Sequence, residues 1–108
     1  MSGTSLDGAD AILADLSGAL PRVIAFAHED YSPALRAELL ALNQSGDDEI
    51  ARSATAARQL AHVYAHASRS AMRSAGVSPA QIAAIGCHGQ TVRHRPDLGF
   101  TVQLNQPA

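Results

Sequence analysis

The sequence predicts an α/β protein in which two pairs of strands flank two helices. Two stretches, 9–16 and 100–106, alternate in the period-two manner of strands. Between them, apolar residues recur at helical spacing and cap residues bound two helices. The predicted order places polar, glycine-bearing segments at strand ends, where open α/β sheets commonly bind ligands.

The first two strands are predicted over residues 9–16 and 21–29. Residues 9–16 (ADAILADL) carry apolar side chains on both faces, which favours an inner strand. The turn-forming residues 17–20 (SGAL) connect it to the second strand, PRVIAFAHE. Because this connection is too short for a crossover, we expect the two strands to be antiparallel.

Two helices follow, and both have clear end signals. Ser32 is a predicted N-cap with Pro33 at the first helical position, and Gly46 is a stop signal. A long helix is predicted over 47–75, which has acidic residues at its start, no proline or glycine within it, and Gly76 after it. The residues expected to face a neighbouring element are mostly small: Ile50, Ala54, Ala57, Ala61, Tyr64, Ser68, Ala71 and Ala75.

The C-terminal part is predicted to return to strands. Ser78 caps a short helical turn, and residues 82–89 (IAAIGCHG) are typical of a buried strand that ends in glycines. Residues 90–99 (QTVRHRPDLG) are a predicted loop, and residues 100–106 (FTVQLNQ) are the last strand.

Composition indicates one small domain with a thin core. The chain has 108 residues, no internal repeat and no low-complexity linker, so we expect no domain boundary. The apolar fraction is 46%, but 22 of these residues are alanine and only four residues are aromatic. The area available for burial per residue is therefore low.

Charge and hydropathy disfavour two classes of partner. The net charge is −2 and the arginines are mostly isolated, which is not typical of a nucleic-acid-binding face. The longest apolar run, VIAFA, is much shorter than a membrane span, and the N-terminus lacks a signal-like pattern. We therefore expect no nucleic-acid or membrane partner and a cytoplasmic protein.

Cysteine and lysine usage excludes several chemistries. Cys87 is the single cysteine, so the chain has no internal disulfide and no CxxC metal site. All eight basic residues are arginine. The chain therefore has no lysine for a Walker-type phosphate loop, a Schiff base or a Ser-Lys dyad.

The first stretch that could bind a ligand is SGTSLDG, residues 2–8. Its glycines allow close approach to the main chain, and its hydroxyl and amide groups could hold a phosphate without lysine. Asp7 and Asp10 would suit such a site if Mg²⁺ lay between them and the phosphate. The alternative is an ordinary hairpin turn, for which the dipeptide Asp7-Gly8 is a standard signal.

The second stretch is GCHGQTVRHRP, residues 86–96. Its density of hydrogen-bond donors suits a polyhydroxyl or anionic ligand. The alternative for His88 is a ring satisfied by a main-chain carbonyl. Because neighbours on a strand point to opposite faces, the sequence disfavours a nucleophile–base pair of Cys87 and His88.

The long helix carries two further candidate groups. His62 and His66 have the spacing of a helical two-histidine metal site, but no HExxH glutamate or third ligand accompanies them. A solvated helix face is favoured over a metal-binding helical module, and the metal content is left unknown. Four arginines are interpreted as surface charges: Arg52, Arg58, Arg69 and Arg73.

Three motifs together resemble the anhydro-N-acetylmuramic acid kinase family: MSGTSLDGADA, IGCHGQTVRHRP and FTVQLNQPA, in the family's order and near its spacing. The resemblance implies a ribonuclease-H-like sheet of the actin, hexokinase and heat-shock-chaperone ATPase type. It implies that ATP and Mg²⁺ are used to phosphorylate and hydrolytically open 1,6-anhydro-N-acetylmuramic acid. The product, N-acetylmuramic acid 6-phosphate, belongs to cell-wall recycling, and a homodimer of the full-length protein is left open.

The resemblance also implies two sets of site residues. The first ATP-phosphate loop would comprise Gly3, Thr4, Ser5, Leu6, Asp7, Gly8, Ala9 and Asp10. The anhydro-amino-sugar cleft would involve His88, Gly89, Gln90, Thr91 and His94. Phosphoryl transfer needs positioning and charge stabilisation, which such a loop with Mg²⁺ supplies, while the attacking water needs a base.

Family members are longer than this chain, which resembles their first part. By the resemblance, the catalytic aspartate, a sugar-binding arginine and a second glycine loop lie beyond Ala108, and an apolar strand normally precedes MSGTS. We therefore expect residues 1–108 to be the N-terminal part of the first kinase domain, inactive alone. The alternative is a non-catalytic truncated module.

Overall fold

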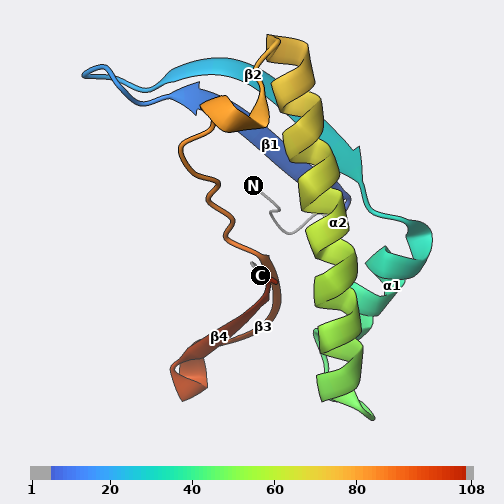
Figure 1. Cartoon of the computed structure of the whole chain (residues 1–108). Coiled ribbons are helices and arrows are strands. Elements are labelled where there is room, and N and C mark those ends of the chain that lie inside the picture. Colours follow the sequence, from blue (N-terminus) through green and yellow to red (C-terminus); the bar gives the residue numbers. More distant parts are fainter. Residues whose placement is uncertain (1–5, 107–108) are drawn as a thin grey trace.

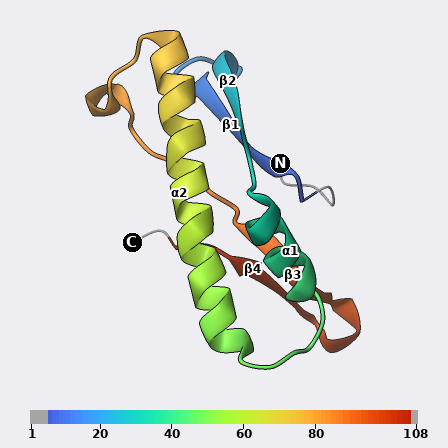
Figure 2. The same cartoon turned by 90° about the vertical axis from the view of Figure 1, so that its right-hand side faces the viewer.

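The computed structural model describes residues 6–106 and confirms the α/β class (Figure 1). Its main elements are β1 (Gly8–Asp15), β2 (Arg22–Asp30), α1 (Pro33–Ala41), α2 (Glu49–Ala75), β3 (Gln90–Arg95) and β4 (Phe100–Leu104). The strands form two separate antiparallel ribbons, β1–β2 and β3–β4. Helix α2 extends past both ribbons, and α1 lies beside its first half (Figure 2). None of the described helices combines the length and apolarity needed to cross a bilayer.

The β1–β2 ribbon confirms the predicted antiparallel pair, with one irregularity in register between Leu13 and Ala14. One face of the ribbon packs on α2, so that Ala11 and Ala27, which are opposite each other, are half-buried. On the other face, the opposed pair Ile12 and Phe26 is 63% and 58% exposed. Among the described residues, β1 pairs with β2 alone, so the prediction of an inner strand is wrong for this structure.

Both helices form in the predicted stretches, but α1 ends at Ala41, ahead of the predicted stop at Gly46, and α2 begins at Glu49, two residues after its predicted start. The Ser32 hydroxyl accepts a hydrogen bond from the Leu35 amide at 3.1 Å, and α1 ends before Gly46. Helix α2 begins at Glu49 and ends at Ala75, and the C-cap residue Gly76 has a φ of +66°, the left-handed conformation expected of a C-terminal glycine.

The predicted inward line of α2 needs correction. Ala57 and Ala71 are buried as predicted, but Ile50 is 88% exposed and Ala54 is also exposed. The buried residues of α2 are Ala56, Ala57, Leu60, Ala67 and Ala71. Positions 56, 60 and 67 lie one residue before the predicted positions 57, 61 and 68, because the position of α1 and the ribbons decides which stripe of the helix is covered.

The core joins the helices to the second ribbon. Within residues 6–106, the two fully buried large side chains are Leu39 of α1 and Leu60 of α2. Val92 of β3 and Leu104 of β4 belong to the same cluster. Among the described residues, thirteen hydrophobic side chains are buried: seven are leucine or valine, five are alanine and one is tyrosine. The large share of alanine agrees with the thin core expected from composition.

The C-terminal strands differ from the prediction. Residues 82–89 form no strand and are largely exposed, with Ile85 at 70%. Pairing starts only at Gln90, which is opposite Leu104, so residues predicted as a loop form β3. The short segment 82–89 has no described strand beside it to pair with, whereas 90–95 pairs with the predicted last strand. The Ser78 turn is confirmed as Pro79–Gln81.

Candidate functional site

A pocket of about 200 Å³ brings the two candidate motifs to one place. One side is β1, from Ala9 to Leu13, and the opposite side is the irregular segment 82–89. Helix α2 supplies the remaining wall with Tyr64, Ala67, Ser68, Ala71 and Met72. Residues 86–89 of the second motif therefore lie across a pocket from Ala9 and Asp10 of the first.

The first motif is described from Leu6 onward, and Gly3, Thr4 and Ser5 lie outside the described residues. Leu6 is buried and has a φ of +48°, the left-handed region that non-glycine residues seldom adopt. The Asp7 carbonyl accepts a hydrogen bond from the Tyr31 amide at 2.9 Å. The end of the motif is thereby attached to the residue that follows β2.

Gly8 is required for close packing of β1 against β2. It begins β1 opposite Asp30, while the connection between β1 and β2 lies at 16–21. The alternative that Asp7-Gly8 is an ordinary hairpin turn stays a prediction, because residues 1–5 lie outside the described residues. A Cβ at Gly8 would clash with the Glu29 carbonyl oxygen and lie 2.6 Å from His28 Nε2.

Asp10 forms a polar cluster with two residues of β2. His28, directly opposite in the register, lies with Nδ1 2.6 Å from Asp10 Oδ1. Its Nε2 lies 3.1 Å from Asp30 Oδ1. These hydrogen bonds, first to Asp10 and then to Asp30, raise the pKa of His28 above its usual value. The protonated ring can donate to both carboxylates at once.

The second motif contains a backbone position that requires glycine. Gly89 has a φ of +74°, and a Cβ there would clash with the Leu104 carbonyl. Before it, Cys87 and His88 are exposed at the pocket. The Cys87 carbonyl accepts a hydrogen bond from Asn105 Nδ2 at 3.1 Å, which attaches this segment to the end of β4.

Tyr31 connects the two motifs, and the sequence analysis missed it. Its amide binds Asp7 as described, and its hydroxyl donates to Gln90 Oε1 at 3.2 Å. Gln90 is 3% exposed, and its Nε2 donates to the Thr91 carbonyl at 3.3 Å. The only sequence signal was a lone aromatic between a predicted strand and a helix cap, which does not identify a partner 59 residues away.

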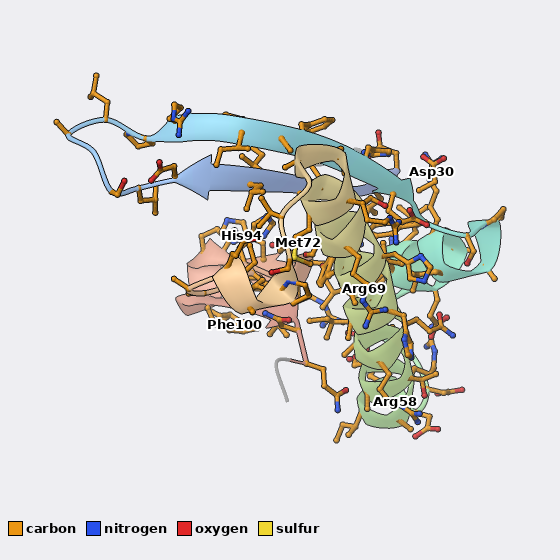
Figure 3. All side chains as sticks on the ribbon, turned by 45° about the horizontal axis from the view of Figure 1, so that its top comes forward. Asp30, Arg58, Arg69, Met72, His94 and Phe100 are labelled. Atoms are coloured by element: carbon orange, nitrogen blue, oxygen red, sulfur yellow. The ribbon has the colours of Figure 1, made fainter. Side chains whose placement is uncertain are left out.

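Of the other predicted sugar-side residues, Thr91 is half-buried in β3 and His94 is exposed opposite Thr101. Neither lines the pocket. Figure 3 labels His94 on the β3–β4 ribbon. Of the predicted sugar-side residues, His88 and Gly89 therefore line the pocket, while Gln90 accepts the hydrogen bond from Tyr31 that connects the two motifs.

Tyr64 adds a second phenol beside Tyr31. Its hydroxyl oxygen is buried and has no hydrogen bond of good geometry to the described residues. Burial, followed by the neighbouring Tyr31 phenol, raises the pKa of Tyr64 strongly. At neutral pH both phenols are therefore protonated, and Tyr64 contributes a neutral wall to the pocket.

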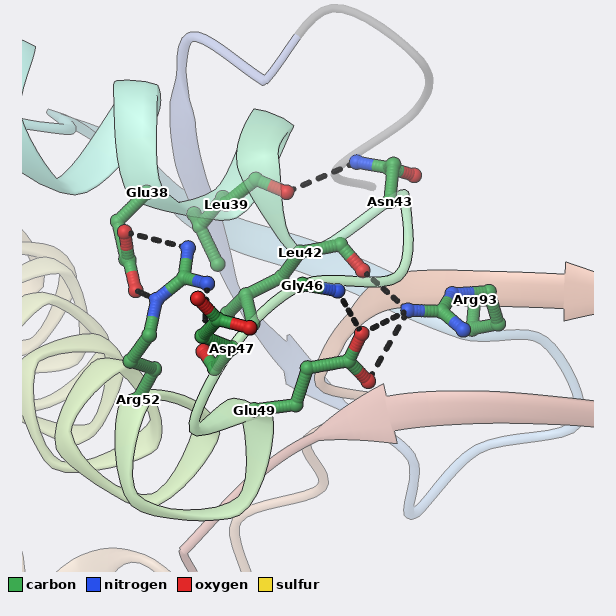
Figure 4. Close-up of polar contacts among 9 residues, drawn as sticks. All are labelled: Glu38, Leu39, Leu42, Asn43, Gly46, Asp47, Glu49, Arg52 and Arg93. Atoms are coloured by element: carbon green, nitrogen blue, oxygen red, sulfur yellow. Dashed lines mark hydrogen bonds and ion pairs between the residues drawn. The ribbon is translucent and has the colours of Figure 1, made fainter.

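An ion-pair network fixes β3 to the connection between the helices (Figure 4). Arg93 Nη2 donates to the Leu42 carbonyl at 3.2 Å and lies 3.2 Å from Glu49 Oε1. Glu49 Oε1 also accepts from the Gly46 amide at 2.6 Å. These contacts, the Gly46 hydrogen bond first, lower the pKa of Glu49.

Three of the four arginines interpreted as surface charges are exposed, and two of them are labelled on α2 in Figure 3. Arg52 is the exception, because its side chain is only 30% exposed and its Nε donates to Glu38 Oε1 at 2.7 Å. Arg52 is therefore a half-buried charge whose ion pair joins α2 to α1.

The described residues contain no group of three His, Cys, Asp or Glu side chains that could hold a metal ion. His62 and His66 are exposed on α2, which confirms the solvated helix face. Asp7 and Asp10 remain the carboxylates of the first motif, and carboxylate oxygens are the donors that Mg²⁺ prefers. The chemistry of these donors fits a magnesium ion carried by a nucleotide, which usually takes only one or two protein carboxylates.

Comparison with known proteins assigns the whole chain to one family. A family model described as anhydro-N-acetylmuramic acid kinase matches residues 1–108. Relatives with that name include proteins of Bordetella pertussis, 56% identical over 108 residues, and Bordetella petrii, 57% identical over 109. A relative from Cupriavidus pinatubonensis is 52% identical over 112 residues. Each alignment covers 100% of this chain but only 29–30% of the relative.

Proposed function

Because the chain belongs to the anhydro-N-acetylmuramic acid kinase family, we propose that it forms the N-terminal part of the first domain of an ATP-dependent sugar kinase. The proposed fold of the complete domain is a ribonuclease-H-like sheet of the actin and hexokinase type. The complete enzyme would phosphorylate and hydrolytically open 1,6-anhydro-N-acetylmuramic acid in cell-wall recycling. These substrates are small and water-soluble, which fits a cytoplasmic enzyme.

The pocket shared by the two motifs is the observation that carries this proposal. The nucleotide side would be the turn from Gly3 to Asp10, and the sugar side would begin at His88 and Gly89. Tyr31 supports this assignment, because its two hydrogen bonds hold Asp7 and Gln90 in a fixed relation. A kinase needs such a relation, since phosphoryl transfer depends on positioning the donor and acceptor.

The chain's own residues would bind and orient, and they would not perform the proton transfer. Backbone amides of the turn would hold phosphate oxygens, and Asp7 or Asp10 would hold the magnesium of the bound nucleotide. ATP supplies the phosphoryl group when bound. A neutral Tyr64 wall and small α2 side chains would shape the space between the two sides. Thr91 and His94 would contact more distant parts of the sugar.

Binding to the 108-residue chain can be tested by NMR. We expect Mg-ADP to shift the amide signals of Gly3 and Gly8, and the anhydro-sugar to shift those of Gly86 and Gly89. Asp10→Asn should weaken the Mg-ADP response, whereas Asp97→Asn, in the exposed turn after β3, should not. A well-dispersed spectrum in which neither ligand shifts the amide signals would contradict binding by this chain.

Turnover tests the second part of the proposal. We expect no phosphorylated sugar when the chain is incubated with ATP, Mg²⁺ and the anhydro-sugar, because the proposed catalytic aspartate is not among its residues. Product formation by the purified chain would show that residues 1–108 contain a complete active site. It would refute the proposal that these residues only bind and orient the ligands.

A further inference from the structure

We propose that His28 is a positioning residue that fixes the Asp10 carboxylate for a magnesium–nucleotide ligand. The inference rests on the proposed function of the first motif as a phosphate site. It concerns a residue of β2 that lies outside both motifs and that neither the sequence pattern nor the family comparison singles out.

Both ring nitrogens of His28 have carboxylate partners. Nδ1 is 2.6 Å from Asp10 Oδ1, and Nε2 is 3.1 Å from Asp30 Oδ1. The three side chains lie on one face of the β1–β2 ribbon, because Asp10 is opposite His28 and Asp30 is two residues further along β2. Figure 3 labels Asp30 at the end of β2 nearest α1.

The His28 ring also lies directly against Gly8. A Cβ at this position would lie 2.6 Å from Nε2 and 2.7 Å from Cε1 of His28, so the ring occupies the space that glycine leaves. The glycine of the first motif therefore leaves the space that the His28 ring occupies. With two hydrogen bonds and this contact, the ring orientation is fixed, and it fixes one oxygen of Asp10 in turn.

A carboxylate held in one orientation binds a cation more tightly than a carboxylate that rotates freely. When a carboxylate holds a metal, loss of its hydrogen-bonding partner typically costs 10- to 100-fold in affinity. The side chains of His28 and Asp10 are 38% and 32% exposed, so solvent weakens their interaction. We therefore expect an effect at the lower end, about 10-fold.

The test compares three variants of the 108-residue chain. His28→Ala removes the ring, and His28→Asn keeps a side-chain amide near the position of Nδ1. His62→Ala, on the exposed face of α2, is the matched control. The first measurement is the Asp10 χ1 rotamer from NMR couplings without ligand. The second is the affinity for Mg-ADP and, with chelator, for ADP alone.

The proposal expects rotamer averaging at Asp10 in His28→Ala, with a fixed rotamer in His28→Asn and in the control. It expects about 10-fold weaker Mg-ADP binding by His28→Ala, partial recovery in His28→Asn, and unchanged binding of metal-free ADP. The magnesium dependence and the recovery distinguish positioning from a general loss of structure.

Three results would overturn the proposal, in two different ways. A fixed Asp10 rotamer in His28→Ala, or equal weakening of Mg-ADP and metal-free ADP, would refute the positioning role while leaving the phosphate site intact. Failure of the unaltered chain to bind Mg-ADP would instead refute the proposed phosphate site, and with it any role of His28 toward a nucleotide.

Discussion

Replacing Leu39 by alanine should remove a large part of the free energy of unfolding. Leu39 is 0% exposed and packs in the cluster that includes Leu60, the other fully buried large side chain. Burial of a leucine side chain contributes roughly 1.5–3 kcal/mol, and the cavity left by truncation adds to the loss. We expect a decrease of about 3 kcal/mol. A small domain has only about 5–15 kcal/mol in total.

Leu40→Ala is the matched control, because Leu40 is the next residue of α1 and is 52% exposed. The expected loss there is below about 1 kcal/mol. Urea denaturation followed by circular dichroism measures both. With a slope near 1 kcal/mol per molar urea, the Leu39→Ala midpoint should fall by about 3 M, or the variant should already be unfolded in buffer. Losses that agree within about 0.5 kcal/mol would refute the described core.

Three further predictions concern the contacts described above. Gly8→Ala should lower the free energy of unfolding by about 1–3 kcal/mol in urea melts, because the added Cβ overpacks the site; an unchanged midpoint would contradict the close approach. Arg93→Met should lower the free energy of unfolding by about 1–2 kcal/mol. Arg95→Met should lower it by less than about 0.5 kcal/mol, because the ion pair of Arg95 is local and exposed. Equal losses in the two variants would refute the network. Hydrogen bonds from the Ser17 hydroxyl and amide lower the pKa of Asp15 from 3.8 to about 2. The stabilising contribution of the ionised Asp15 carboxylate is complete above pH 4 and is lost as the pH falls through 2. The Ser17 amide signal should therefore shift across that range. A shift centred at pH 4 would contradict the lowered pKa.

Local signals predicted the helices and the first ribbon well. The caps at Ser32 and Gly76 act through hydrogen bonds and backbone conformations within a few residues, so the sequence contains the whole cause. Pairing was harder to predict. Residues 82–89 have strand-like composition, but a strand also needs a neighbour to accept its hydrogen bonds, and no described strand lies there.

Some features of the candidate site could likewise be predicted from the sequence, and others could not. The sequence determined which segments contain glycines, hydroxyls and carboxylates suited to a phosphate and a sugar, because residue type fixes the available donors, acceptors and backbone freedom. Only the tertiary structure decided that Tyr31 joins Asp7 to Gln90 and that His28 lies opposite Asp10. Those contacts span 18 to 59 residues, and they depend on the ribbon register and on where α2 packs. Neither is contained in any short stretch of sequence, because register and packing are set by the burial of the whole chain.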